Sequence, residues 1–198
     1  MVAETVGEEK TMNVVEPGSA LVAAPALQDP NFCRTVVLII DHGELGSLGV
    51  VLNRPSDVAV RDVLPLWGPH ATVTSALYVG GPVHHREALC VAALPAGVDA
   101  EHTVGITTVC GPLALVDLGA DPDLMAPRLR GLRVFAGYTG WRRGQLAGEI
   151  NRGDWLVVPA LPDDVLAPPD VDLWGRVLRR QGMPLALLAS YPTDPTLN

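Results

Sequence analysis

The chain has 198 residues, of which 48% are hydrophobic and 18% are charged, and its formal net charge at pH 7 is −8. This composition is typical of a folded globular protein and excludes an intrinsically disordered chain. The negative charge also argues against a general binder of nucleic acid or of an anionic membrane surface.

Three regions are expected along the chain. Residues 1–17 are polar and acidic without periodicity, which predicts a flexible lead-in. Residues 18–188 are predicted to form a single domain, and residues 189–198 a frayed tail. No basic segment precedes an apolar run near the N-terminus, so we expect no signal peptide. No apolar run approaches the ~18 residues of a membrane helix, so we expect a soluble protein without a membrane partner.

The first part of the domain predicts strands. Apolar and β-branched runs indicate strands at 19–24, 35–40 and 47–53, and the glycine-rich turn before the third run makes the last two a hairpin. The run at 35–40 has no polar interruption, which suits a strand buried on both faces. Pro55 ends the third strand. A short helix is expected at 60–67.

The rest of the chain mixes strands and helices. Strands are expected at 77–80, 88–94, 103–109, 132–137 and 155–159, and helices at 112–118, 121–130 and 144–150. A last helix is expected to begin after the N-cap Asp170 and to end before Gly182 and Pro184. This order predicts a mixed α/β or α+β fold with an antiparallel start.

The cysteines and histidines do not form a recognisable catalytic or metal motif. At ~3.3 Å per residue, the strand between Cys33 and His42 separates them by about 25–30 Å, which excludes a local dyad. A partner for either end from His84, His85 or His102 stays open. The adjacent His84 and His85 diverge and lack a third ligand at zinc spacing, so we expect no metal.

Cysteine usage favours a cytoplasmic location. The three cysteines have no CxxC spacing, which indicates free thiols in a reducing compartment. Cys90 lies in an apolar run and is expected to be buried, whereas Cys110, beside a glycine, is expected to be more exposed. No nucleotide-binding glycine motif is present, and we expect no cofactor.

A glycine- and arginine-rich segment is the strongest candidate site. It comprises Gly137, Tyr138, Gly140, Trp141, Arg142, Arg143 and Gly144. We expect it to lie between a strand and a helix, where backbone N–H groups bind anions. Tyr138 and Trp141 could stack on a flat ligand. In the alternative interpretation, the glycines allow a tight turn while both aromatic side chains fill the core.

The same segment is basic within an acidic chain. Residues 128–152 contain six arginines and one acidic residue, Glu149, which gives a formal charge of +5. Clustered arginines could contact phosphates, including those of nucleic acid. No helix-turn-helix or zinc-finger pattern accompanies them. The alternative is a set of solvated surface arginines.

Five separated segments resemble the AlgH/YqgE family. They are GSALVAAPALQDPNFCRTVVLIIDHGELGSLGVVLNRP at 18–55, YVGGPV at 78–83, GYTGW at 137–141, GQL at 144–146 and EI at 149–150. The chain departs from the family pattern at Thr139 and at Ala147-Gly148. The resemblance implies an α/β fold with a barrel-like mixed sheet flanked by helices, and a part in transcriptional regulation. It supplies no catalytic residues.

The favoured function is therefore a regulatory or binding module rather than an enzyme. It would use residues 128–152 to bind an anionic ligand or protein partner. One alternative is an enzyme with an unrecognised hydrolytic or thiol-dependent site. Another is an interaction protein that forms a homo-oligomer without a ligand.

Overall fold

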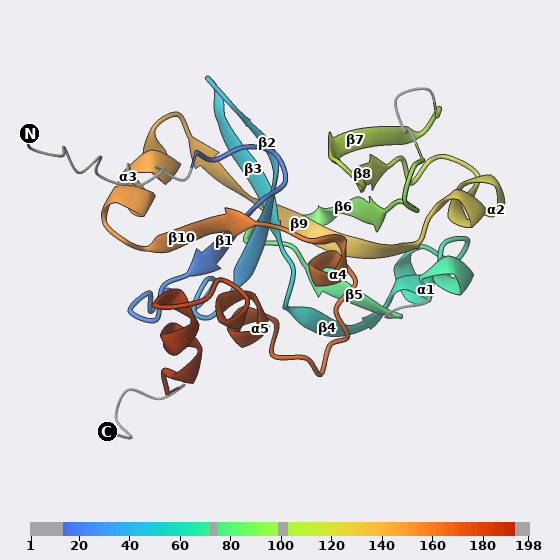
Figure 1. The fold of residues 1–198 in the computed structure, drawn as a ribbon. Helices are drawn as coiled ribbons and strands as arrows, with labels where there is room; N and C mark the ends of the chain where they lie inside the picture. Colours follow the sequence, from blue (N-terminus) through green and yellow to red (C-terminus); the bar gives the residue numbers. More distant parts are fainter. Residues whose placement is uncertain (1–13, 72–74, 99–102, 193–198) are drawn as a thin grey trace, which may run out of the picture.

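A mainly antiparallel sheet that curls into half a barrel forms the centre of the molecule (Figure 1). The computed structural model describes residues 14–71, 75–98 and 103–192. The ten described strands are β1 (Ser19–Ala23), β2 (Val36–Gly43), β3 (Gly46–Val51), β4 (Pro55–Ala59), β5 (Ala76–Val79), β6 (Val83–Ala93), β7 (Ile106–Cys110), β8 (Leu113–Val116), β9 (Gly131–Arg142) and β10 (Trp155–Pro159).

The main path of the sheet runs β10-β1-β2-β3-β9-β6-β8-β7, and neighbouring strands on it are antiparallel. Strand β5 forms a side branch, because it pairs in parallel with β9 and antiparallel with β4. The fold is thus mixed α/β with a half-barrel sheet, which confirms the expected fold class.

The helices are short. They are the α-helices α1 (Val60–Val63), α2 (Pro122–Met125), α3 (Gln145–Asn151), α4 (Pro162–Val165) and α5 (Leu173–Arg179), and the 3-10 helices η1 (Gly68–His70), η2 (Ala126–Arg128) and η3 (Leu185–Ser190). The expected helix at 144–150 is confirmed by α3. The helices expected at 60–67 and 121–130 form only in part, as α1 and as α2 followed by η2.

Two predictions about helices are wrong. Residues 112–118 contain strand β8, because Leu113 and Ala114 are buried where β8 pairs with both β6 and β7. The last helix begins later than expected, since its N-cap is Asp172 and not Asp170. The Asp172 carboxylate accepts a hydrogen bond from the Gly175 N–H at 3.0 Å.

Strand β2 is buried on both faces, as its β-branched run predicted. On one face Leu38 packs with Trp174, and helices α4 and α5 cover this cluster. On the opposite face Val37 packs with Trp141, under helix α3. Alternate residues of a strand point to opposite faces, so a strand with both faces covered needs apolar residues at every position.

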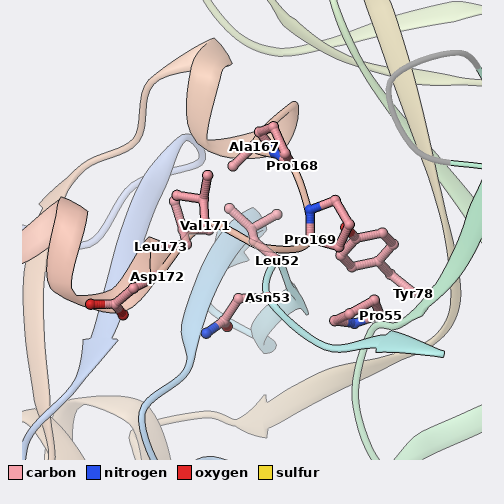
Figure 2. Close-up of a pocket in the computed structure, with 10 residues that line it drawn as sticks. All are labelled: Leu52, Asn53, Pro55, Tyr78, Ala167, Pro168, Pro169, Val171, Asp172 and Leu173. Carbon is pink, nitrogen blue, oxygen red and sulfur yellow. The ribbon is translucent and has the colours of Figure 1, made fainter.

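The segment between α4 and α5 leaves a small cavity beside the end of β3 (Figure 2). The cavity has a volume of about 70 Å³. It is lined by Leu52, Asn53, Pro55, Tyr78, Ala167, Pro168, Pro169, Val171, Asp172 and Leu173.

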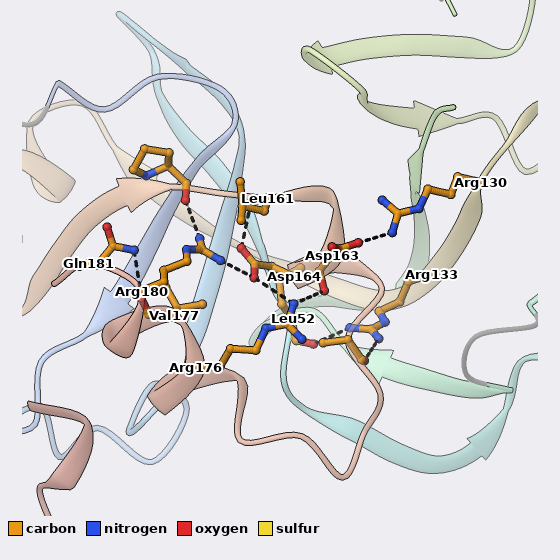
Figure 3. Close-up of polar contacts among 12 residues, drawn as sticks. Leu52, Arg130, Arg133, Leu161, Asp163, Asp164, Arg176, Val177, Arg180 and Gln181 are labelled. Atoms are coloured by element: carbon orange, nitrogen blue, oxygen red, sulfur yellow. Dashed lines mark hydrogen bonds and ion pairs between the residues drawn. The ribbon is translucent and has the colours of Figure 1, made fainter. Parts of the chain in front are cut away.

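A buried carboxylate fixes α4 against α5 (Figure 3). Asp164 is fully buried and accepts hydrogen bonds from the Leu161 N–H at 2.9 Å and from Arg180 at 2.6 Å. Arg176 lies 3.8 Å from the same carboxylate. A buried charge is tolerated only when it is paired and hydrogen-bonded, and Asp164 meets both conditions.

Parts of the expected lead-in and tail, residues 1–13 and 193–198, lie outside the described residues. Within the described part of the chain, every helix is too short or too polar to cross a lipid bilayer.

Candidate functional site

Strand β9 continues further than the sequence suggested and contains most of the expected site. Residues 137–142 belong to this strand and do not form a turn before a helix. At Gly137, φ is +68°, and a Cβ atom would lie 2.6 Å from the Val83 carbonyl oxygen. The register of β6 against β9 shifts between Val83 and Ala88 at this point. The glycine thus allows a bulge within the strand.

Trp141 belongs to the hydrophobic core. Its side chain is buried, and its indole N–H donates to Glu149 at 2.7 Å. Trp155 donates to the same carboxylate oxygen at 2.9 Å, and the two indole rings meet edge to face at 6.0 Å. Trp141 therefore fills the core, as the alternative interpretation predicted, and does not offer its ring to a flat ligand. Tyr138 is half-buried, and its ring stacks on His84 at 5.4 Å.

Arg142, Arg143 and Gly144 lie on the surface, as does Gly140 earlier in β9. The backbone N–H of Arg142 already donates to the Gln145 side chain at 3.1 Å. The hollow next to Trp141 is lined by two acidic residues, Asp41 and Glu44, which disfavour an anion there. The seven expected residues are therefore divided by burial: Gly137 and Trp141 are buried, Tyr138 is half-buried, and the other four are exposed.

The six arginines of residues 128–152 do not share a face. Arg130 pairs with Asp163, and Arg152 pairs with Asp154 at 2.7 Å. The expectation of a solvated surface arginine is wrong for Arg133, which is 2% exposed. The segment is basic by count, but its charges lie in different environments.

Arg133 is a buried cation held by backbone carbonyls (Figure 3). It donates to the carbonyl oxygen of Leu52 at 3.0 Å and to that of Ala167. The guanidinium carbon lies 4.0 Å from the ring centre of Tyr78. Burial lowers the pKa of Arg133 to about 10, so the side chain keeps its charge at neutral pH. It forms no ion pair with any residue that the structure describes.

A cleft of about 260 Å³ lies outside the end of β3 and combines basic and rigid residues. It is lined by Pro30, Asn31, Val51, Arg54, Pro55, Val79, Gly81, Pro82 and His85. Three segments of the sequence meet here: the turn after β1, the connection from β3 to β4, and the turn from β5 to β6. We refer to it as the Arg54–His85 cleft.

Hydrogen bonds and close packing hold the walls of this cleft. The Val79 N–H donates to the Arg54 carbonyl at 2.8 Å, which joins β5 to the segment that carries the arginine. At Gly81 a Cβ atom would lie 2.4 Å from the backbone of Tyr138, so only glycine fits. The Asn31 N–H donates to the Asp29 carboxylate at 2.8 Å and closes the turn after β1.

The charge of the cleft is positive. The half-buried Arg54 side chain donates one hydrogen bond, at 2.9 Å, to the Cys33 carbonyl, and this is its only hydrogen bond to the described residues. His85 is exposed and also lines the cleft. None of the nine lining residues is acidic. A guanidinium fork and an imidazole are groups that bind carboxylate and phosphate oxygens.

Sequence reasoning missed Arg54 and His85 as partners. Thirty residues separate them, and neither belongs to a known binding motif. The available signal was the clustering of turn-forming prolines and glycines around both residues, at Asn53-Arg54-Pro55 and Gly80-Gly81-Pro82. Such clusters indicate where the backbone turns. They do not indicate which of these turns lie next to one another in the folded protein.

The thiols have the expected exposures. Cys90 is buried and Cys110 is exposed. Burial raises the pKa of the Cys90 thiol to about 12, which makes it a poor nucleophile at neutral pH. Strand β2 runs between Cys33 and His42, so they do not form a dyad. No group of three or more His, Cys, Asp or Glu with metal-binding geometry occurs in the described parts of the chain.

Comparison with known proteins places this fold in a family. The AlgH-like family model, DUF179, matches residues 20–186. The chain is 53% identical over 188 residues to a UPF0301 protein of Rhodococcus jostii, which covers 95% of this chain and 94% of the relative. The chain belongs to the AlgH-like family.

Solved structures of the AlgH-like family agree. Protein DIP2367 from Corynebacterium diphtheriae matches with a TM-score of 0.87 and 48% identity, over 90% of this chain and 93% of that one. The AlgH protein from Pseudomonas aeruginosa matches with a TM-score of 0.63 and 30% identity, over 88% and 93% of the two chains. None of these names states an activity, a substrate or a partner.

Proposed function

We propose that this AlgH-like protein is a binding module for a small anionic ligand, and that the ligand binds in the Arg54–His85 cleft. The observation that carries the proposal is that Arg54 and His85 line one cleft that has no acidic lining residue, on a chain whose net charge is −8. A volume of about 260 Å³ suits a phosphate or a small organic acid.

The proposal keeps the expected ligand class but moves the site. The glycine- and arginine-rich segment contributes only its first part, because a Cβ atom at Gly137 would lie 3.3 Å from the His85 Cα. Gly137 therefore supports the wall of the cleft from behind. The prolines fix their own φ angles, and the backbone at Gly81 packs closely against that of Tyr138, so the walls that carry the two basic side chains need little reorganisation for a ligand to bind.

Arg54→Gln is the sharpest test, because glutamine keeps a donor for the Cys33 carbonyl and removes the charge. The measurement is a titration with inorganic phosphate, followed by amide chemical shifts in NMR spectra. We expect the Kd to rise at least about tenfold, since a hydrogen bond to a charged group contributes about 1.5–3 kcal/mol. Arg128→Gln, at an exposed arginine outside the cleft, is the matched control. Equal affinity of the native and Arg54→Gln proteins would refute the proposed site.

We further propose that this binding serves transcriptional regulation in the cytoplasm rather than catalysis. The membership of the AlgH-like family and the three free cysteines support this use and this location. The test compares transcript levels in cells that express the native or the Arg54→Gln protein in place of the chromosomal copy. Identical transcript profiles, with the variant present at native abundance, would contradict a regulatory role for the cleft.

A further inference from the structure

The turn between β1 and β2 lines a second and larger hollow besides the Arg54–His85 cleft. Asn31 of this turn lines the cleft, whereas Cys33 and Arg34 line the second hollow, which we call the Arg34 pocket. The pocket has a volume of about 450 Å³, within the roughly 300–1,000 Å³ of small-molecule sites. The turn lies beside η3 and the residues that follow it (Figure 1). The lining residues are Pro25, Ala26, Gln28, Cys33, Arg34, Tyr191 and Pro192.

The backbone at Arg34 is in an unusual conformation. Its φ is +53°, and in the described part of the chain only one other non-glycine residue, His84, has a positive φ. Asn53 holds the turn in place, because its side-chain N–H donates to the Arg34 carbonyl at 2.9 Å and its side-chain oxygen accepts from the Val36 N–H at 3.0 Å. Long side chains rarely adopt this conformation, and residues held in it are concentrated at functional sites.

The Arg34 guanidinium is fixed at the wall of the pocket. Its Nη1 donates to the carbonyl oxygen of Tyr191 at 3.0 Å, and its central carbon lies 4.0 Å from the ring centre of the buried Trp174. A guanidinium has five N–H donors, and Arg34 uses one of them on the residues that the structure describes. The remaining donors are available to a ligand.

The charge of the Arg34 pocket is positive. Arg34 is half-buried and forms no ion pair with any described residue. None of the seven lining residues is acidic. The adjacent Asp29 does not line the pocket, and its carboxylate accepts the Asn31 N–H. A partly buried cation without a counter-charge attracts an anion more strongly than one in bulk water.

The rest of the pocket wall is mostly apolar. Two prolines, an alanine, a thiol and a tyrosine ring contribute to it, and the amide of Gln28 is the other polar side chain besides Arg34. Small-molecule sites typically combine such apolar walls with a few polar groups that orient the ligand. The wall therefore fits a ligand that has one negative group and an apolar body.

We propose that the Arg34 pocket binds an aromatic carboxylate. The free donors of Arg34 bind the carboxylate oxygens, since a guanidinium matches the geometry of that group. The aromatic ring packs against the prolines and Tyr191, whose ring favours offset or edge-to-face contacts. The pocket shares no lining residue with the Arg54–His85 cleft, so this site goes beyond the function proposed above and is tested independently of it.

The native protein carries its own reporter of this site. Cys33 lines the pocket, and its thiolate sulfur displaces iodide from iodoacetamide to form a stable thioether that peptide mass spectrometry locates. With benzoate as the probe, we expect Cys33 to be alkylated several-fold more slowly, because the bound ring blocks access to the thiol. The exposed Cys110 lies outside the pocket and is the internal control, expected to react at an unchanged rate.

Arg34→Gln tests the carboxylate contact, with benzoate titrated by NMR. We expect the Kd to rise at least about tenfold, because hydrogen bonds to a charged group are lost. Arg128→Gln, at an exposed arginine outside the pocket, is the matched control and should keep the native affinity. Benzamide, which has the shape of benzoate without the charge, is expected to bind the native protein several-fold more weakly.

Three outcomes would overturn the proposal. They are an alkylation rate of Cys33 that does not depend on benzoate, equal affinity of the native protein for benzoate and benzamide, and native benzoate affinity in Arg34→Gln. The first two use only the native protein, so they decide the question even if Arg34→Gln does not fold.

Discussion

The two ends of strand β9 carry arginines from one basic segment in opposite environments. Near its start, Arg133 is buried and held by two carbonyls and an aromatic ring. At its end, Arg142 and the following Arg143 are exposed. The comparison teaches that a charge count along the sequence does not describe a surface, because the packing of the sheet decides which charges reach solvent.

The difference comes from what covers the strand. The first five residues of β9 are all buried, so a guanidinium at the third position can satisfy its donors only with backbone groups or aromatic rings. Beyond Gly137 exposed and buried residues alternate, and the strand ends beside the β2–β3 hairpin. There, long side chains reach water without cost.

The largest effect is expected for Arg133→Ala, with a loss of about 3 kcal/mol in the free energy of unfolding. The truncation leaves a cavity and two unpaired carbonyls, at Leu52 and Ala167. Urea denaturation measures the loss, and Arg128→Ala is the exposed control, expected within about 0.5 kcal/mol of native.

Arg133→Met separates packing from hydrogen bonding. Methionine fills much of the same volume, so a loss of about 1–2 kcal/mol is expected from the unpaired carbonyls alone. If Arg133→Met is at least as stable as the native protein, the cost of burying the charge exceeds the gain from its hydrogen bonds.

An intermediate effect is expected for Glu149→Gln at the far end of the strand. The Glu149 carboxylate accepts from both Trp141 and Trp155, and bonds to a charged acceptor are stronger than those to a neutral amide. We expect a loss of about 1–2 kcal/mol together with a change in near-ultraviolet circular dichroism. The control Glu44→Gln, on the exposed hairpin, should change neither quantity; an unchanged tryptophan signal in Glu149→Gln would contradict the role of this carboxylate.

The smallest effect on stability, within about 0.5 kcal/mol, is expected for the double variant Arg142→Ala and Arg143→Ala. The same variant tests whether this surface binds a phosphate-bearing partner. With a short single-stranded oligonucleotide as probe, two lost phosphate contacts would reduce the slope of log Kd against log salt by about 1.4. An affinity that is independent of salt, or unaffected by the double substitution, rules out this surface as a polyanion site.

The sequence predicted the strands and the fold class better than it predicted the residues of the candidate binding site. Because the uninterrupted apolar run at 36–40 has one physical explanation, burial on both faces, that part of β2 was predictable. Residues 112–118 were wrongly assigned to a helix, because four apolar residues cannot distinguish a short strand from a helix without knowledge of their neighbours.

Long-range pairing accounts for what could not be predicted. Glycines at 137 and 140 suggested a turn, yet the bulge opposite β6 lets the strand continue through Gly137. Arg54 and His85 line one cleft because β5 pairs with the segment after β3. Neither the bulge nor this pairing leaves a periodic signal in the sequence, since both depend on distant strands.

The way in which Arg133 is held affects how the sequence can change over time. Both of its acceptors are main-chain oxygens, which every amino acid provides. A substitution at 52 or 167 therefore keeps the acceptor itself, although both side chains are buried and packing still limits their size. No other residue at 133 supplies two parallel donors and a stacking plane, so tolerance to mutation should be lowest at this position.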